Sequence, residues 1–177
     1  DVMPYNPEAA KQLLADAGYP DGFTLSLKLP KPYQPHVDSG QIIADQLAKI
    51  GITCDIEIVE WATWMSDVYT DKKYDMTVVA HSGRLDPYNF LSRYRSDSGD
   101  YLSLLSGDVD ALLDEALQEK DEAKRKELYE QIQQILAEEV PCVYIQSLSK
   151  FYGLTENVEG FTIYPIDMLN LKAISFS

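Results

Sequence analysis

Helix-type and strand-type segments alternate over the first 80 residues, and this alternation restricts the fold more than any other feature. Residues 7–17 and 37–50 place apolar side chains three and four positions apart, the spacing of one helical face. The strand-type segments are residues 23–29, 52–58 and 76–80. Strands joined by helices at this pace favour parallel pairing through right-handed crossovers. We therefore expect an α/β fold with a mostly parallel sheet flanked by helices.

The second half of the sequence predicts helices followed by strands. Apolar stripes indicate a short helix over residues 88–95, a second over 109–117 and a long one that begins after Asp121. The segment Cys142–Gln146 and the region 149–177 have strand-like patterns. No repeat or low-complexity linker interrupts the sequence. A single domain over residues 1–177 is therefore the simplest expectation.

The net charge of −14 limits the possible partners. A surface this acidic repels phosphate backbones and anionic lipids, so nucleic acid is not an expected partner. Residues 107–140 hold 11 acidic and 4 basic side chains, net −7, which is half of the excess. A pair of solvated helices and a docking face for a basic partner both remain open for this region.

Motifs of catalysis and metal binding are almost absent. No glycine-rich phosphate loop, HExxH or GxSxG is present. An SxxK pattern at Ser147–Lys150 follows a predicted strand and lacks its usual partner motifs. Cys54 and Cys142 form no CxxC, which argues against structural zinc, and a disulfide between them remains open. We therefore expect no catalytic residue, no metal site and no cofactor.

The predicted sheet indicates where a ligand would bind. Open α/β sheets bind ligands outside the carboxyl ends of their strands. After the third strand this edge is the loop His81–Asp86, in which His81 is divided between a ligand contact and a structural role. Trp61 begins a helix just after the second strand, where its ring can line a cleft, whereas Trp64 is expected in the core. His36 follows a proline-rich loop and is expected to be exposed.

Eight stretches of the sequence, in order, follow the pattern of one known family. They begin with YNPEAAKQLLADAGYPDGF and are Tyr5–Phe23, Ala48–Ile52, Glu60–Trp64, Lys73–Met76, Asp86–Leu91, Val109–Ala116, Leu136–Pro141 and Val158–Phe161. Together they resemble the bacterial ABC-transporter solute-binding proteins of the peptide/nickel family, extracellular solute-binding family 5. The resemblance covers nearly the whole chain.

The resemblance implies a two-lobe protein in which this chain is one lobe. Members of the family are much longer, and a hinge joins two lobes that enclose the ligand. Residues 1–177 look like the C-terminal lobe, with C-terminal strands leading back to a missing N-terminal lobe and its signal or lipoprotein peptide. The implied function is capture of a peptide or related small solute in the periplasm or outside the cell, followed by delivery to an ABC permease. No bond is made or broken in such a function.

The resemblance also implies a set of ligand-binding residues. Dipeptide-binding members carry a Pro-Tyr pair after the first strand, which corresponds here to Pro32 and Tyr33. After the third strand such members have Gly-Trp-Thr-Gly-Asp, whose aspartate pairs with the peptide amine, where this chain has Ala80–Arg84. Arg84 thus reverses a charge and favours a carboxylate or phosphate, unless Asp86 takes the acidic role. The predicted ligand-binding residues are Tyr33, Trp61, His81, Ser82, Gly83, Arg84 and Asp86.

Several alternatives stay open at this stage. Within the family, His81 is compatible with a nickel or metal chelate, and Arg84 with an anionic small molecule. Oligopeptides, dipeptides, modified sugars and opine-like compounds are equally compatible ligands. From other classes, a hydrolase that uses an α/β cleft and an interaction module that uses the acidic helices over residues 108–139 are the competing interpretations.

Overall fold

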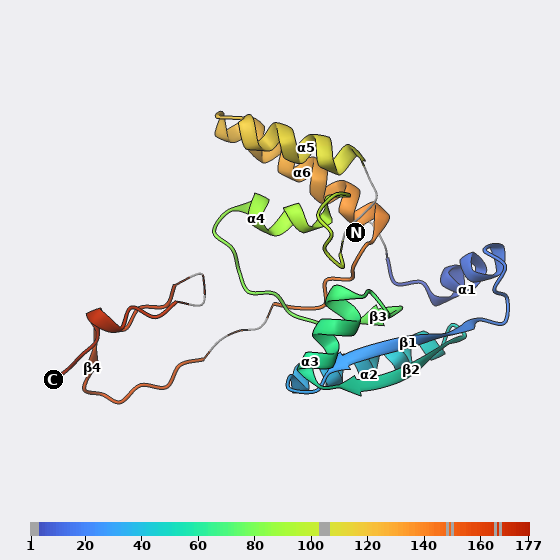
Figure 1. Ribbon diagram of the computed structural model, residues 1–177, viewed down its shortest axis with the longest axis horizontal. Coiled ribbons are helices and arrows are strands. Elements are labelled where there is room, and N and C mark those ends of the chain that lie inside the picture. Colours follow the sequence, from blue (N-terminus) through green and yellow to red (C-terminus); the bar gives the residue numbers. More distant parts are fainter. Residues whose placement is uncertain (1–3, 103–106, 148, 150, 165, 167) are drawn as a thin grey trace. The chain divides into compact units, whose positions relative to one another are not determined.

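The chain divides into two compact units, Asp1–His81 and Ser82–Ser177, which are named here the first and the second unit. A computed structural model describes residues 4–102, 107–147, 149, 151–164, 166 and 168–177 (Figure 1). Within these residues no helix combines the length and the apolar character that a membrane span requires. The two units are described separately.

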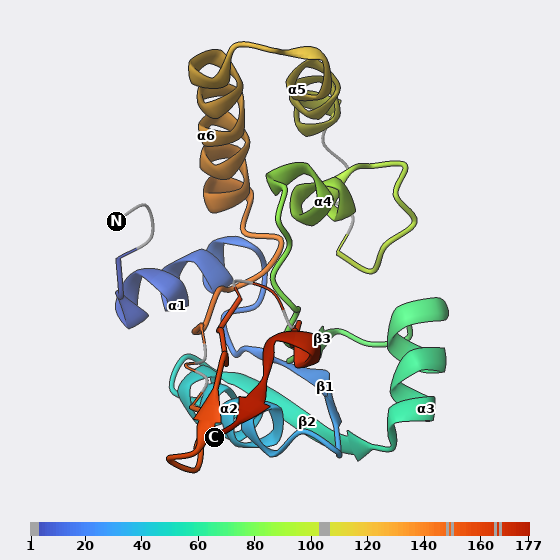
Figure 2. The same ribbon diagram turned by 90° about the vertical axis from the view of Figure 1, so that its left-hand side faces the viewer.

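The first unit confirms the alternation of helices and strands. Its elements are α1 (Pro7–Asp16), β1 (Phe23–Pro30), α2 (Gln34–Ala48), β2 (Ile52–Val59), α3 (Trp61–Trp64) with its π-helical continuation Met65–Thr70, and β3 (Met76–Thr77). The strands form one parallel sheet, as predicted, and their order is β2-β1-β3. Figures 1 and 2 show β1 and β2 side by side. The third strand is shorter than the predicted 76–80, because only Met76 and Thr77 pair with β1.

The two faces of β1 pack against different helices because alternate side chains point to opposite sides of a strand. Leu25, Leu27 and Leu29 are buried in one apolar cluster with Val37 of α2. Each buried leucine contributes roughly 1.5–3 kcal/mol of apolar stabilisation. Lys28 points to the opposite face, towards the π-helical segment. Figure 1 shows α2 behind the strands and α3 in front of them, in agreement with this alternation.

A close contact between two glycines sets the start of β1 against the start of β2. Gly22 and Gly51 both have positive φ angles, of 75° and 94°. A Cβ atom added to Gly22 would lie 1.8 Å from the carbonyl oxygen of Gly51, so the two backbones can meet only because no side chain is present. From this point the register runs from Phe23↔Ile52 to Pro30↔Val59.

The second unit is built mainly from helices. Its elements are α4 (Pro87–Leu91), the 3₁₀ turn Ser92–Tyr94, α5 (Gly107–Gln118), α6 (Glu122–Glu139), β4 (Val158–Glu159), the 3₁₀ turn Leu171–Ala173 and β5 (Ser175–Phe176). Figure 1 shows α5 and α6 as an adjacent antiparallel pair. Asp121 caps α6 as predicted, because its carboxylate accepts hydrogen bonds from the amides of Ala123 and Lys124 at 3.0 Å. Leu113, Ile132 and Tyr94 lie in the core of this unit.

The predicted strand over Cys142–Gln146 is wrong. The segment follows the left-handed residue Val140 and Pro141 and has no regular secondary structure. The side chains of Val143, Tyr144 and Ile145 are exposed. An apolar pattern becomes a strand only where another strand accepts its hydrogen bonds, and within the described residues β4 pairs only with β5. The predicted strand character of residues 149–177 is confirmed only for these two short strands.

Candidate ligand-binding site

The three parallel strands end at the same edge of the sheet, and two predicted site residues lie there. The register pairs Pro30 with Val59 at the carboxyl ends of β1 and β2. Tyr33 precedes α2 directly, and Trp61 is the first residue of α3, so each follows the end of a strand. The centroids of their rings are 5.4 Å apart, and the rings meet edge to face at 79°. The structure therefore brings Tyr33 and Trp61 together.

Two more rings extend this pair into a ring cluster, which consists of Tyr33, His36, Trp61 and Trp64. His36 lies 5.1 Å from the ring of Tyr33, and Trp64 stacks on Trp61 at 5.0 Å with an interplanar angle of 5°. Trp64 is only 2% exposed, whereas Trp61 is 37% and Tyr33 is 43% exposed. The cluster thus has a buried inner ring and an outer surface of two aromatic side chains that a ligand can contact.

The inner ring is fixed to the sheet by a chain of hydrogen bonds. The indole nitrogen of Trp64 donates to Thr77 Oγ1 over 2.9 Å. The hydroxyl of Thr77 in turn donates to the carbonyl oxygen of Lys28 over 2.7 Å. Since Thr77 belongs to β3 and Lys28 to β1, the orientation of the indole is tied to two strands. Trp61, stacked on this ring, is held in place without being buried.

Charged pairs hold the elements around the ring cluster together. The ammonium group of Lys28 lies 2.9 Å from Asp67 Oδ2 and 3.7 Å from Glu57 Oε2. The hydrogen bond to Asp67 is the largest cause that raises the pKa of Lys28, and the same bond lowers the pKa of Asp67. An ion pair between Lys31 and Glu60 connects the ends of β1 and β2 at the site's edge. Because both of its side chains are exposed, it contributes little to stability.

The beginning of β3 is held by one carboxylate. Asp75 accepts hydrogen bonds from the backbone amide of Ser26 at 2.7 Å and from its hydroxyl at 2.9 Å. These two bonds lower the pKa of Asp75. They join β3 to β1 just before the residues that pair, and so position Thr77 beneath Trp64.

His36 is the site residue that the sequence analysis missed. The structure places it in the first turns of α2, half-buried against Tyr33, and not in an exposed loop. Burial lowers its pKa, so the imidazole is neutral at neutral pH. Its buried Nδ1 has no hydrogen-bond partner among the described residues. The helical spacing of three positions from Tyr33 was the available signal, but it depends on α2 starting before Val37.

The remaining predicted site residues lie after β3. His81 is exposed and ends the first unit, whereas Ser82, Gly83, Arg84 and Asp86 are exposed and belong to the second unit. Asp86 is the N-cap of α4, and its carboxylate accepts the amide hydrogen of Tyr88 at 2.8 Å. This contact gives Asp86 a structural role. Contacts of these five residues with a ligand remain predictions.

Metal binding and thiol chemistry receive no support from the geometry. Across the described ranges, no three or more His, Cys, Asp or Glu side chains gather where they could hold a metal ion. Cys54 and Cys142 are free thiols, so the optional disulfide is not formed. The SxxK stretch Ser147–Lys150 falls partly outside the described residues.

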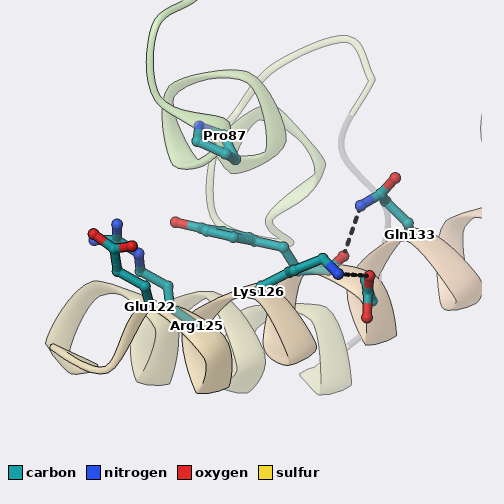
Figure 3. A pocket seen from close by; sticks show the side chains of 7 residues that line it. Pro87, Glu122, Arg125, Lys126 and Gln133 are labelled. Carbon is teal, nitrogen blue, oxygen red and sulfur yellow. Dashed lines mark hydrogen bonds and ion pairs between the residues drawn. The ribbon is translucent and has the colours of Figure 1, made fainter.

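A groove of about 340 Å³ lies beside α6 in the second unit (Figure 3). Its lining residues are Pro87, Glu122, Arg125, Lys126, Tyr129, Glu130 and Gln133. The charges in it are of both signs, and Lys126 pairs with Glu130 at 3.2 Å. The Gln133 side-chain amide donates to the backbone carbonyl of Tyr129 at 3.2 Å. Because Lys126 and Gln133 already have partners inside it, the groove offers less for a ligand than the ring cluster does.

Comparison with known proteins agrees with the fold of the chain. Residues 1–102 match the family described as bacterial extracellular solute-binding proteins, family 5 Middle. The di/tripeptide-binding protein 1 of Pseudomonas aeruginosa is 28% identical over 97% of this chain. A dipeptide-binding protein of the same species is 31% identical over 92% of it. The solved structure of the oligopeptide-binding protein AppA from Bacillus subtilis, in complex with a nonapeptide, covers 98% of the chain with 25% identity and a TM-score of 0.79.

All three of these relatives are much longer than the chain. The chain spans 34% and 32% of the two Pseudomonas proteins and 38% of AppA. It therefore corresponds to about a third of each relative, and the match to AppA extends over nearly all of the chain.

Proposed function

Because the chain belongs to the bacterial extracellular solute-binding proteins of family 5, we propose that it forms one lobe of a two-lobe protein that captures a peptide. The observation that carries this proposal is the ring cluster at the carboxyl edge of the parallel sheet. The names of the Pseudomonas relatives and the nonapeptide in AppA support a peptide as the ligand class. No step of the proposed function makes or breaks a covalent bond.

The proposed mechanism is capture between two lobes. The exposed rings of Tyr33 and Trp61 offer a flat apolar surface on which peptide planes and side chains pack. Because Trp64 is held by the sheet, the surface is formed before the ligand arrives, which lowers the entropic cost of binding. Closure of an N-terminal lobe over this surface would exclude water, and the closed form would dock on an ABC permease. The protein would act in the periplasm or outside the cell, and a lipoprotein anchor is one way to keep it there.

Arg84 is proposed to select the ligand by charge. It is exposed and lies in the loop that follows β3. An arginine repels an ammonium group and pairs with a carboxylate, so it favours the acidic end or an acidic side chain of a peptide. His81, Ser82 and Gly83 belong to the same loop and are proposed to contribute polar contacts.

The ring surface is tested by calorimetric titration of the two-lobe protein with a panel of di- and oligopeptides. Tyr33→Ala and Trp61→Ala are each expected to weaken binding about tenfold or more, since buried aromatic anchors dominate binding energy. Tyr19→Ala is the matched control, because Tyr19 is an exposed ring of the same unit that lies before the amino end of β1. Equal affinities for all four proteins would rule out the ring cluster as the ligand surface.

The charge selection is tested separately with Arg84→Asp. This variant is expected to shift preference towards peptides with a free amine over their N-acetylated forms. Arg84→Lys retains the positive charge and is expected to keep the original order of affinities. An unchanged preference in Arg84→Asp would remove Arg84 from the site while leaving the ring surface intact.

A further inference from the structure

Two arginines, two residues apart in the second unit, differ sharply in their surroundings. Arg95 donates from Nε to Asp97 Oδ1 at 2.8 Å and from Nη1 to Asp114 Oδ1 at 2.6 Å. Arg93 has its Nε and Nη1 shielded from solvent, and neither nitrogen has an acceptor among the described residues. Arg95 also donates from Nη2 to Asp97 Oδ2 at 3.2 Å. Both nitrogens that Arg93 leaves unpaired therefore have counterparts in Arg95 that donate to carboxylates.

A contact that the structure gives for the Arg93 guanidinium is with an aromatic ring. Its guanidinium carbon lies 5.2 Å from the centre of the Phe90 ring, a cation–π contact that offers no directed lone pair. In the same unit, the hydroxyl of Tyr144 lies 3.0 Å from the hydroxyl of Tyr94, which also contacts Cys142 Sγ at 3.2 Å. The positive charge of Arg93 opposes the rise that burial causes in the pKa of Tyr144.

We propose that Arg93 is the binding group of a carboxylate site in the second unit. An arginine side chain carries a positive charge, and two shielded donor nitrogens without an acceptor are unfavourable. A carboxylate is the group whose geometry and charge match it best. The carboxylate comes either from the bound peptide or from an acidic side chain of the second lobe. The choice between these two sources depends on the proposed function, whereas the affinity of Arg93 for a carboxylate does not.

The segment that follows α6 is open to solvent in the same unit. It has no regular secondary structure from Cys142 to Ser147, and the side chains of Val143 and Ile145 are exposed. Arrival of a carboxylate at Arg93 converts two unpaired donors into charge-assisted hydrogen bonds.

The site itself is tested on the full 177-residue chain by NMR of the arginine Nε–Hε signals. Sodium acetate is the probe, and sodium chloride at equal ionic strength is the reference. The Arg93 signal, assigned by its loss in Arg93→Gln, is expected to shift with saturation, whereas the Arg95 signal stays in place because it is already paired. An Arg93 signal that moves no more than that of Arg95 would overturn the proposal. This readout stands even if the two-lobe protein binds no peptide.

The two sources of the carboxylate are separated in the two-lobe protein. A peptide with a free carboxyl end is compared with its C-terminally amidated form, in the parent protein, Arg93→Gln and the control Arg95→Gln. If the ligand is the source, Arg93→Gln lowers the ratio of acid to amide affinity about tenfold. If the second lobe is the source, Arg93→Gln leaves the ratio of acid to amide affinity unchanged. The unfolding temperature of ligand-free Arg93→Gln is then lower than that of ligand-free Arg93→Lys. An unchanged ratio together with equal unfolding temperatures would overturn the proposal.

Discussion

The two units of this chain use aromatic side chains in opposite ways. In the first unit, Tyr33 and Trp61 are partly exposed at one edge of a sheet and are steadied by a buried tryptophan. In the second unit, Tyr94 is 1% exposed in a helical core, where its hydroxyl contacts Cys142 and Tyr144. Tyr33 and Trp61 lie where a helix begins just after a parallel strand, whereas Tyr94 ends a short turn that packs on α5 and α6. The position in the fold, more than the residue type, decides whether a ring can meet a ligand.

The polar groups follow the same division. In the first unit, Lys28, Asp67 and Asp75 connect strands and helix beneath the ring cluster. In the second unit, Arg95 gathers Asp97 and Asp114 near the surface, while Arg93 lacks an acceptor at two nitrogens. The first unit thus exposes an aromatic surface that is held in place, and the second unit contains the arginine that we propose to bind a carboxylate. The following changes probe this difference, beginning with the largest expected effect.

Gly22→Ala is expected to destabilise the first unit by about 4 kcal/mol. The new methyl group would collide with the carbonyl of Gly51 and would also require a left-handed alanine. Urea unfolding followed by tryptophan fluorescence measures the effect, since the only two tryptophans are Trp61 and Trp64. Gly18→Ala is the control, because Gly18 has a φ of 92° with nothing within 4 Å, and it should cost about 1 kcal/mol. Equal losses of stability in the two variants would show that the starts of β1 and β2 can move apart at little cost.

Leu113→Ala is expected to destabilise the second unit by about 3 kcal/mol, because the fully buried side chain leaves a cavity between α5 and α6. Leu117→Ala in the same helix removes a side chain that is 55% exposed and should cost about 0.5 kcal/mol. Far-UV circular dichroism follows the helices. If the unfolding midpoint from tryptophan fluorescence shifts in Leu113→Ala by as much as the midpoint from circular dichroism, the two units unfold together. Their stabilities then cannot be compared separately.

Asp121→Ala is expected to cost about 1 kcal/mol, since the amides at the start of α6 lose their acceptor. Asn6→Ala removes the equivalent cap from α1, where Asn6 Oδ1 accepts from Ala9 at 3.0 Å. Because α1 has no buried residue, its loss should fray that helix and leave the fluorescence transition unchanged. Circular dichroism and fluorescence recorded on both variants check this pair. A fluorescence shift in Asn6→Ala as large as the dichroism shift in Asp121→Ala would contradict it.

Acid is expected to weaken the first unit gradually. The pKa values of Asp67 and Asp75 are lowered by their hydrogen bonds to Lys28 and Ser26, so the folded state binds fewer protons than the unfolded state. Their contribution to the free energy of unfolding is present above about pH 4, the ordinary pKa range of aspartate. It is lost as the pH falls through the lowered pKa values of the folded state. Asp75→Asn should flatten the pH dependence of the fluorescence midpoint, whereas Asp45→Asn on the exposed side of α2 should leave it unchanged. Parallel curves for both variants would show that Asp75 is not involved.

Much of the first unit was predictable, because its elements follow from local patterns. Alternation placed the strands and helices, the position after the second strand placed Trp61 at the edge of the sheet, and the family resemblance indicated Tyr33. The failures have a common cause. The segment Cys142–Gln146 has a strand-like pattern but no partner strand among the described residues, and β3 is short because only two of its residues reach β1. Both outcomes depend on a neighbour that periodicity does not reveal.

By itself, the sequence determined the order of elements in the first unit, the start of α6 after Asp121, and the edge at which the parallel strands end. Each of these depends on residues a few positions apart. Only the tertiary structure decided that Trp64 would be fixed through Thr77 and Lys28, that His36 would pack against Tyr33, and that Arg95 rather than Arg93 would receive two carboxylates. Most of these contacts join side chains from separate elements, and their distances are set by how helices and strands pack, which local patterning does not encode.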